Sequence, residues 1–351
     1  MCEILFVMLK RFFVFNLLSV FSLYSQTNVS QVDVAIIGGG CSGLSAAMVL
    51  SEYDWKTAVY SGPKKGGSLN VKTVVGNWPG RTTTLGSAIL SDLDEQLGSF
   101  RQNIRETSVT ACNFSNYPFE LSLSDGNKVL AKTVLIATGT QERKLKTEGF
   151  DLYWEKGIWS NDAFYKYDLK PYLEAVKGKT VVVIGGGIDA LRKAVYSIRG
   201  GAKKAIILVR SDGMNVDPKH QKMLAQMKEI EINKNSTVAA FVGDGSSLQS
   251  VLVKTPEGEM HIETSHVVLA IGRLPNSDLF RGLISLDQDG CIELENGQQS
   301  SLPGVFAAGD VTTSFAYGQG AIAAGDGMKA AYEIIQFLEE RSSPANLEEK
   351  F

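Results

Sequence analysis

VAIIGGGCSG, from Val34 to Gly43, is the stretch that decides the expected fold. Its first four residues form an apolar run with the length and composition of a buried β-strand. Gly38, Gly40 and Gly43 then follow with G-x-G-x-x-G spacing, and a helical pattern without proline begins at Leu44. The first glycine permits the turn, the second lets a pyrophosphate approach the backbone, and the third lets helix and strand pack closely. The N-terminus of the helix would point N–H groups at the phosphates.

A second copy of this pattern, TVVVIGGGIDALRKA, begins at Thr180. One copy alone is weak evidence for a dinucleotide site. Two copies, each placed between a strand and a helix, predict an α/β protein with two Rossmann-like dinucleotide-binding domains. We expect each domain to have three layers, of the ββα type.

Composition agrees with this fold class. A chain of 351 residues has room for two domains, and 44% hydrophobic with 21% charged residues is typical of globular proteins. The net charge of -3 gives no reason to expect nucleic acid as a partner. The four cysteines, at positions 2, 41, 112 and 291, include no C-x-x-C, and there are three histidines, so we expect no metal site.

The N-terminus has a different character. Lys10 and Arg11 precede an apolar run from Phe12 to Tyr24, and small or polar residues follow. A basic start, a short apolar run and a small residue near its end are typical of an export signal. We therefore expect residues 1–25 to be an export signal or an N-terminal anchor, and the protein to be exported or membrane-associated. The alternatives are an upstream stretch that is not translated, and a cytoplasmic protein.

Further motifs extend over most of the chain, from Val32 to Leu338. After GGGCSG they are Gly66-Gly67-Ser68-Leu69, Asn77-Trp78-Pro79-Gly80, Ala137-Thr138-Gly139, Gly185 to Ala190, Gly272 to Asn276, Gly304 to Asp310, and Gln319. In order and spacing the chain resembles the low-molecular-weight thioredoxin reductases. The resemblance implies an FAD domain in two parts, residues 31–145 and 268–340. It also implies a nicotinamide domain, residues 146–267, inserted between them, with a tail at 341–351.

The resemblance also assigns the site residues. FAD would be bound by Gly38, Gly39, Gly40, Cys41, Ser42, Gly43, Gly67, Ser68, Leu69, Asn77, Gly139, Gly309, Asp310 and Gln319. NADPH or NADH would be bound by Gly185, Gly187, Ile188, Asp189 and Arg210. Asp310 would accept hydrogen bonds from the ribityl chain, and Asn77 and the Gly67 turn would line the flavin. Relatives of this kind are usually homodimers, and we expect the same here.

The chain departs from the family where electrons should leave the flavin. The family has C-x-x-C followed by Asp, whereas this chain has Ile158-Trp159-Ser160-Asn161-Asp162. Asp162 matches the family's proton-transfer acid, but both cysteine positions are lost. Without a thiolate there is no attack on a bound disulfide. We expect Trp159 to pack at the interface of the domains, with stacking near the flavin as the alternative.

Two further departures concern cofactor and thiol chemistry. The family's arginine-rich turn, which holds the 2′-phosphate of NADPH, reads Val209-Arg210-Ser211-Asp212-Gly213-Met214-Asn215 here. Only Arg210 remains, so NADH becomes a plausible donor. Cys41 stands at the start of the first helix, where the N-terminus would lower the pKa of a thiol. We expect a small residue filling a buried turn, and a catalytic thiol is the alternative.

Two functions remain open. The first is an FAD-dependent oxidoreductase that takes hydride from NAD(P)H and passes electrons to an acceptor other than an internal dithiol. That acceptor could be a ferredoxin-like protein, a quinone, dioxygen or a small disulfide. The second is a degenerate FAD-binding protein with a role in binding or assembly and little turnover. An export signal would favour the second, because a nicotinamide pool is lacking outside the cell.

Overall fold

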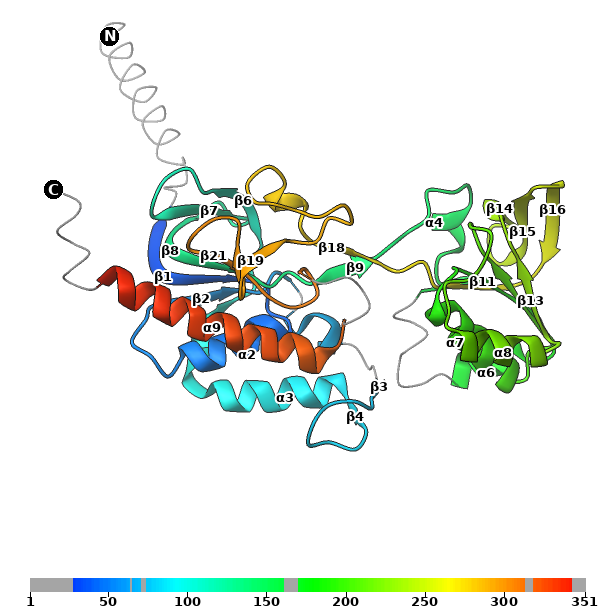
Figure 1. The fold of residues 1–351 in the computed structure, drawn as a ribbon, viewed down its shortest axis with the longest axis horizontal. Helices are drawn as coiled ribbons and strands as arrows, with labels where there is room; N and C mark the ends of the chain where they lie inside the picture. Colours follow the sequence, from blue (N-terminus) through cyan, green and yellow to red (C-terminus); the bar gives the residue numbers. More distant parts are fainter. Residues whose placement is uncertain (1–27, 64, 71–73, 161–169, 313–317, 343–351) are drawn as a thin grey trace, which may run out of the picture.

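The computed structural model describes residues 28–342, apart from 64, 71–73, 161–169 and 313–317. The chain forms two α/β domains joined by a ribbon of two strands (Figure 1). The expected export signal or anchor at 1–25 and the tail at 341–351 fall outside the described residues, apart from 341 and 342. In the described part of the chain, no helix has the length and apolar character needed to cross a membrane.

The first domain is built on a mixed sheet with the order β19-β20-β21-β8-β1-β2-β5. Its parallel strands are β1 (Val29–Ile37), β2 (Thr57–Tyr60), β5 (Ile104–Arg105), β8 (Lys128–Ile136) and β21 (Val305–Ala307). Antiparallel additions are β6 (Val109–Asn113) and β7 (Phe119–Leu123) beside β8, and β19 (Leu294–Asn296) and β20 (Gln299–Ser300) beside β21. Short elements complete it: η1 (Gly67–Asn70), β3 (Val74–Val75), β4 (Thr84–Leu85), η2 (Gly98–Asn103) and η3 (Asp278–Phe280).

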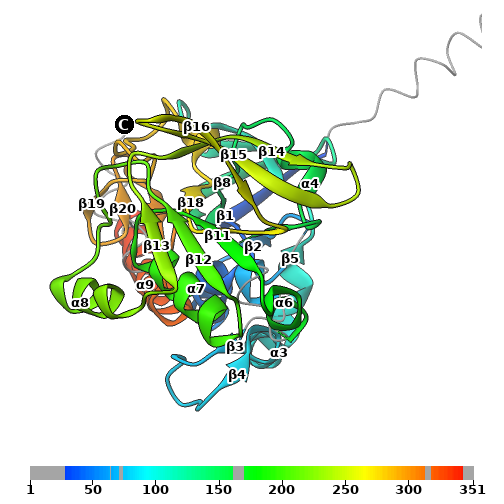
Figure 2. The same cartoon turned by 90° about the vertical axis from the view of Figure 1, so that its right-hand side faces the viewer.

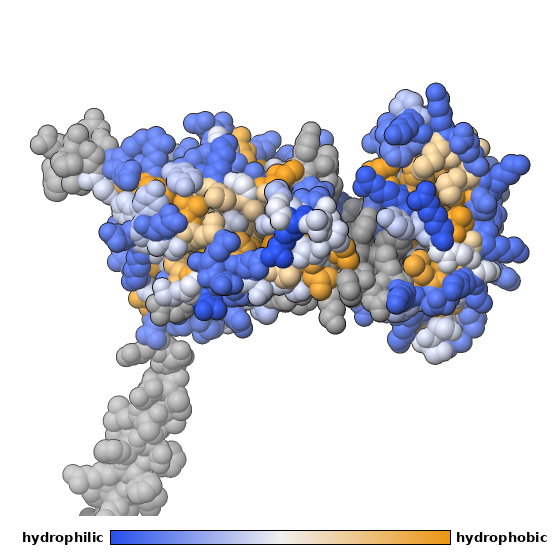
Figure 3. Space-filling model, turned by 90° about the horizontal axis from the view of Figure 1, so that it is seen from below, coloured by the Kyte–Doolittle hydropathy of each residue, from blue (hydrophilic) through white to orange (hydrophobic). Residues whose placement is uncertain are grey.

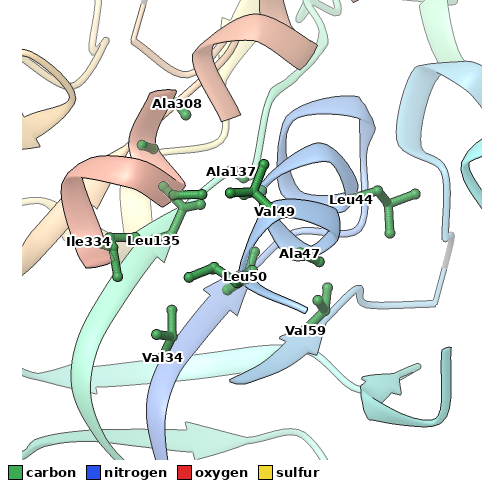
Figure 4. Close-up of a cluster of buried hydrophobic side chains, with 14 of the residues drawn as sticks. Val34, Leu44, Ala47, Val49, Leu50, Val59, Leu135, Ala137, Ala308 and Ile334 are labelled. Atoms are coloured by element: carbon green, nitrogen blue, oxygen red, sulfur yellow. The ribbon is translucent and has the colours of Figure 1, made fainter. Parts of the chain in front are cut away.

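Helices α2 (Cys41–Leu50), α3 (Gly86–Leu97) and α9 (Gly320–Ser342) cover one face of this sheet (Figure 1). Figure 4 shows Leu50 of α2 beside Val34 of β1, Leu135 of β8 and Ile334 of α9, all buried in one apolar cluster. A second cluster on the opposite face lies under β6 and β7. Burying the strands on both faces explains why β1 and β8 end in continuous apolar runs instead of alternating patterns.

The second domain has a parallel sheet with the order β10-β17-β11-β12-β13. Its strands are β10 (Ile158–Trp159), β11 (Thr180–Ile184), β12 (Lys204–Leu208), β13 (Ile230–Asn233) and β17 (His266–Leu269). Helices α6 (Lys170–Val176), α7 (Ile188–Arg199) and α8 (Pro218–Gln226) cover one face, as Figure 2 shows. The other face carries α4 (Phe150–Tyr153) and an antiparallel sheet of β14 (Thr237–Gly243), β15 (Leu248–Thr255) and β16 (Gly258–Glu263). The predicted ββα layering is confirmed.

The ribbon between the domains pairs β9 (Thr140–Glu142) with β18 (Arg273–Pro275). The chain leaves the first domain through β9 and returns through β18, so the second domain is inserted into the first. Arg273 fastens the ribbon, because its guanidinium donates hydrogen bonds to the hydroxyl and the carbonyl of Thr140, at 2.8 and 3.0 Å. Strand β17 ends at Leu269, so the return crossing lies slightly after the expected boundary at 267.

Candidate functional site

The first glycine turn has the tight geometry that its sequence predicts. Gly38 has φ +118°, and a Cβ there would lie 2.2 Å from the carbonyl oxygen of Ala137. A Cβ at Gly43 would lie 2.0 Å from the carbonyl oxygen of Gly38. At Gly40, by contrast, no described atom lies within 4 Å of an added Cβ. The backbone is therefore packed below the turn and open at Gly40, where a ligand could approach it.

Three of the predicted motifs meet at one edge of the first sheet. Strands β21, β8 and β1 are parallel neighbours, so their carboxyl ends lie side by side. Gly38 follows β1, Gly139 follows β8, and Gly309 and Asp310 follow β21. Ligands of open α/β sheets bind at this edge. A cavity of about 280 Å³ opens at the same edge and is lined by Ile37, Val109, Thr138, Gln141, Asn276, Asp278, Leu279 and Phe280.

Asp310 is a half-buried carboxyl group at this edge. Burial raises its pKa, the positive charge of Arg273 opposes that rise, and the carboxyl group of Asp326 adds to it. Asp326 lies on α9, accepts a hydrogen bond from the N–H of Gly309, and also has a pKa raised by burial. A carboxylate held in this way is a strong acceptor for hydroxyl groups.

The start of α2 carries two polar side chains, of which one has a hydrogen-bond partner and the other has none among the described residues. The hydroxyl of Ser42 is buried and finds no hydrogen-bond partner among the described residues. Gly309 approaches it closely, since an added Cβ there would lie 3.0 Å from the Cβ of Ser42. The thiol of Cys41 instead donates to the carbonyl of Gly320 at 3.0 Å. An orphaned hydroxyl next to the open turn leaves one donor for a bound group.

The loop that follows β2 closes over the turn. Gly66 donates its N–H to the carbonyl of Gly39 at 2.7 Å, and a Cβ at Gly67 would lie 3.3 Å from the Cα of Gly40. In η1, Ser68 is exposed and Leu69 is buried. The amide of Asn77 donates to the side-chain carbonyl of Gln319, although the two residues lie far apart in the sequence. The structure thus brings Asn77 and Gln319 together.

The second glycine turn repeats the geometry of the first. Gly185 has φ +148°, and a Cβ there would lie 2.1 Å from the carbonyl oxygen of Ala270, which follows β17. At Gly187 no described atom lies within 4 Å of an added Cβ. Ile188 begins α7, and Asp189 lies in its first turn, where it pairs with Lys193. The larger cavity near this sheet, of about 460 Å³, lies at the opposite edge beside Thr180 and Ser265.

Comparison with known proteins decides the family. A family model described as pyridine nucleotide-disulphide oxidoreductase matches residues 32–327. The chain belongs to this family. It is 31% identical over 324 residues to a thioredoxin reductase of Debaryomyces hansenii, covering 89% of this chain and 98% of that protein. A thioredoxin reductase of Borreliella burgdorferi is 31% identical over 319 residues, covering 90% of this chain and 94% of the relative.

A solved structure gives the same answer. The thioredoxin reductase of Lactococcus lactis, in what its title calls the FR conformation, matches with a TM-score of 0.71 and 26% identity. The match covers 88% of this chain and 99% of that one. The chain is therefore an FAD- and NAD(P)-dependent, thioredoxin reductase-like oxidoreductase.

The residues of this thioredoxin reductase-like protein fit FAD at the first turn. The open backbone at Gly40, the orphaned hydroxyl of Ser42 and the carboxyl group of Asp310 surround one edge of one sheet. The first two would hold the pyrophosphate, and Asp310 would accept from sugar hydroxyls. Asn77 and Gln319 would face the flavin ring.

The thiol of Cys41 is buried at the start of α2. Burial raises its pKa to about 12, and the charge of Asp310 contributes to the rise. The desolvation of a buried thiolate outweighs the attraction of the helix N-terminus. The burial of Cys41 therefore favours the expectation of a small residue in a buried turn over the alternative of a catalytic thiol.

The segment expected to replace the family's dithiol begins in the core of the second domain. Ile158 is fully buried and pairs with Val267 in the sheet. Trp159 packs edge to face on Tyr172, with ring centroids 5.0 Å apart. The indole packs against the apolar cluster under α6 and α7, within the second domain. Packing at the interface of the domains and stacking near the flavin stay predictions. Asp162 lies outside the described residues.

Arg210 is exposed just after β12, at the start of the turn expected to hold a 2′-phosphate. In that turn the hydroxyl of Ser211 donates to the carbonyl of Gly213 at 3.0 Å, so this hydroxyl is engaged within the turn.

Two charged residues near the glycine turns were not among the predicted site residues. They are Lys193, with 0% of its side chain exposed, and Arg273 in the ribbon. Lys193 lies on the apolar face of α7, and this position is the only feature of the sequence that indicates its burial.

Proposed function

We propose that this protein transfers hydride from NAD(P)H to FAD and passes the electrons to an acceptor outside the chain. Bound FAD supplies a centre that accepts a hydride and releases its electrons singly or in pairs. The protein itself holds the two cofactors at two glycine turns. The observation that carries the proposal is that all three described thiols have a pKa raised by burial, which does not favour an internal dithiol relay.

The described thiols are poorly suited to disulfide exchange. Burial raises the pKa of Cys41 to about 12 and that of Cys112 to about 12, and it also raises the pKa of Cys291. The attacking species in disulfide exchange is the thiolate. At neutral pH these three groups remain protonated, and Cys2 lies outside the described residues. Nor does the sequence supply a C-x-x-C pair at 158–161, where it has Ile-Trp-Ser-Asn.

The test is steady-state oxidation of NADH and of NADPH by the purified, FAD-saturated protein. Each is measured with ferricyanide and with a quinone dye as acceptor, because neither dye needs a dithiol. We expect turnover that follows the FAD content of the preparation. A fully FAD-loaded protein that oxidises neither nucleotide with either dye would instead support a role in binding or assembly with little turnover.

Location and assembly belong to the same proposal. The basic and apolar N-terminal stretch supports an exported or membrane-associated protein, and the family supports a homodimer. Mass spectrometry of the N-terminus after expression in a secreting host would show a cleaved signal. Light scattering during gel filtration would give the oligomeric state.

A further inference from the structure

The N-terminus of α7 differs from that of α2 in carrying an acid. The first turn of α2 contains no acidic residue, whereas the first turn of α7 contains Asp189. A carboxylate at this place is favoured by the helix dipole. The same N–H groups and dipole end are what a diphosphate would use. Asp189 is therefore an internal anion at the position where the second glycine turn would receive an external one.

The buried Lys193 forms an ion pair with Asp189. Lys193 lies one turn further along α7, and its side chain is 0% exposed. Its ammonium group lies 2.8 Å from a carboxylate oxygen of Asp189 and donates to the carbonyl of Leu269 at 2.7 Å. Burying a lone ammonium group is costly, so a lysine at this depth needs such partners.

Lys193 connects α7 to the backbone beside the second glycine turn. Leu269 is the last residue of β17, and the next carbonyl, that of Ala270, is the one that Gly185 packs against. The backbone carbonyl of Lys193 accepts from the hydroxyl of Ser197 at 2.7 Å, and Ser197 in turn contacts the hydroxyl of Tyr172. The ammonium group is thus fixed beneath the turn, where it can draw the carboxylate toward the sheet.

We propose that Lys193 is a positioning residue for the nicotinamide dinucleotide. It neutralises Asp189 and holds the carboxylate against the body of α7, which keeps the N–H groups at the helix N-terminus available to a diphosphate. Without the ammonium group, the carboxylate would repel the diphosphate and compete for the same N–H groups. This inference rests on the proposed function, because it requires a dinucleotide at the second turn.

The test uses ADP-ribose, which carries the diphosphate but no nicotinamide and undergoes no redox reaction. Isothermal titration calorimetry measures its dissociation constant for the FAD-saturated wild-type protein and for Lys193→Met. We expect the variant to bind at least about tenfold more weakly. Raising the salt concentration should narrow this difference, because salt screens the repulsion from a partly exposed carboxylate.

A second substitution separates electrostatics from structure. Asp189→Asn in the Lys193→Met background removes the negative charge but does not restore the hydrogen bond to Leu269. We expect the double variant to recover most of the wild-type affinity. Asp189→Asn alone should bind ADP-ribose at least as tightly as the wild type, contrary to the expectation that Asp189 binds the nucleotide. Lys193→Gln, which removes the positive charge but keeps a hydrogen-bond donor, should weaken binding like Lys193→Met and carries the test if Lys193→Met does not fold. Lys177→Met is the matched control, because it breaks an exposed ion pair with Glu174 on α6.

The outcomes are distinct. If Lys193→Met binds ADP-ribose as tightly as the wild type, or if the double variant stays as weak as Lys193→Met, the inference is wrong. In that case the proposed function still stands if NAD(P)H is oxidised. If the affinities change as expected but no nucleotide is oxidised, the inference stands and the proposed function fails. A wild-type protein that binds no ADP-ribose contradicts both.

Discussion

Asp310 is subject to two opposing requirements. Its carboxylate is placed to accept hydrogen bonds at the carboxyl edge of the first sheet, which serves binding of FAD. Burial raises the pKa above the ordinary aspartate value of 3.8, so the folded protein without FAD binds a proton more readily than the unfolded chain does. Stability of the FAD-free protein should therefore fall as the pH rises through the window between 3.8 and the raised pKa.

Asp310→Asn should separate these two effects. We expect the variant to retain FAD less well, by about 1.5–3 kcal/mol, because a neutral amide replaces a charged acceptor. The FAD-free variant should nevertheless melt at a higher temperature than FAD-free wild type at pH 7, since no charge remains to be desolvated. Fluorescence titration with FAD and thermal melts of the stripped protein measure the two quantities. Asp54→Asn is the control, because Asp54 is exposed between α2 and β2 and should change neither value. A stripped variant less stable than the wild type would contradict the argument.

Arg210 is the one arginine left in the turn for the 2′-phosphate, and it is exposed. Exposed ion pairs contribute about 0–1 kcal/mol. We therefore expect NADPH to bind less than about tenfold more tightly than NADH, since tenfold needs about 1.4 kcal/mol. Arg210→Gln should remove that small preference and leave the affinity for NADH unchanged. Anaerobic titration of each nucleotide against bleaching of the flavin absorbance gives both constants. A preference above about a hundredfold would mean that another cation holds the phosphate.

At the scale of elements, the contact between α2 and α9 positions the first turn. A Cβ at Gly327 of α9 would lie 2.0 Å from the backbone oxygen of Ser42, so the two helices touch through their backbones. The contact fixes the start of α2, where the FAD pyrophosphate is expected.

Figure 3 shows the surface of the molecule from below, on which apolar residues are scattered among hydrophilic ones.

Gly327→Ala should therefore destabilise the first domain. The added methyl group meets backbone atoms that cannot rotate away, and overpacking of this kind costs about 1–3 kcal/mol. Gly325→Ala on the same helix is a matched control, because no described atom lies within 4 Å of its Cβ. Replacing an exposed helical glycine by alanine should stabilise by about 0.5–1 kcal/mol. Urea unfolding of both variants measures the two signs. Equal effects of the two substitutions on the free energy of unfolding would show that helix propensity, and not the contact with Ser42, determines the stability change.

The elements that sequence could predict are those with a strong local signal. The strands before both glycine turns, β1 and β11, are apolar runs, and they end where the sequence places their ends, at Ile37 and Ile184, although β1 begins five residues earlier than expected, at Val29. Strands β14 and β16 have a weaker local signal, because only one side of each is covered and polar residues interrupt them. In the site, the glycines follow from spacing. The contact of Asn77 with Gln319 and the burial of Lys193 depend on tertiary packing that one sequence does not show.

At the scale of the whole molecule, the segment expected to replace the family's redox pair is part of a core. Ile158, which the resemblance places at the first cysteine position, is fully buried between the sheet and the layer of β14–β16. A side chain there is shielded from a protein acceptor. The change at this position therefore fits a chain whose electrons leave the flavin by a different route.

The last prediction follows from this change, and it concerns thioredoxin. We expect the FAD-saturated protein not to reduce thioredoxin with NADPH or NADH at a useful rate, while ferricyanide is reduced. Reduction of a protein disulfide needs an attacking thiolate, and the pKa values of Cys41 and Cys112, both raised to about 12, keep these thiols protonated at neutral pH. The measurement is insulin precipitation coupled to thioredoxin, with a thioredoxin reductase that has C-x-x-C as the positive control. If thioredoxin were reduced robustly, Cys41→Ala, Cys291→Ala and Cys2→Ser would identify the thiol responsible. Loss of the reaction in Cys41→Ala would mean that a conformational change exposes this thiol during turnover.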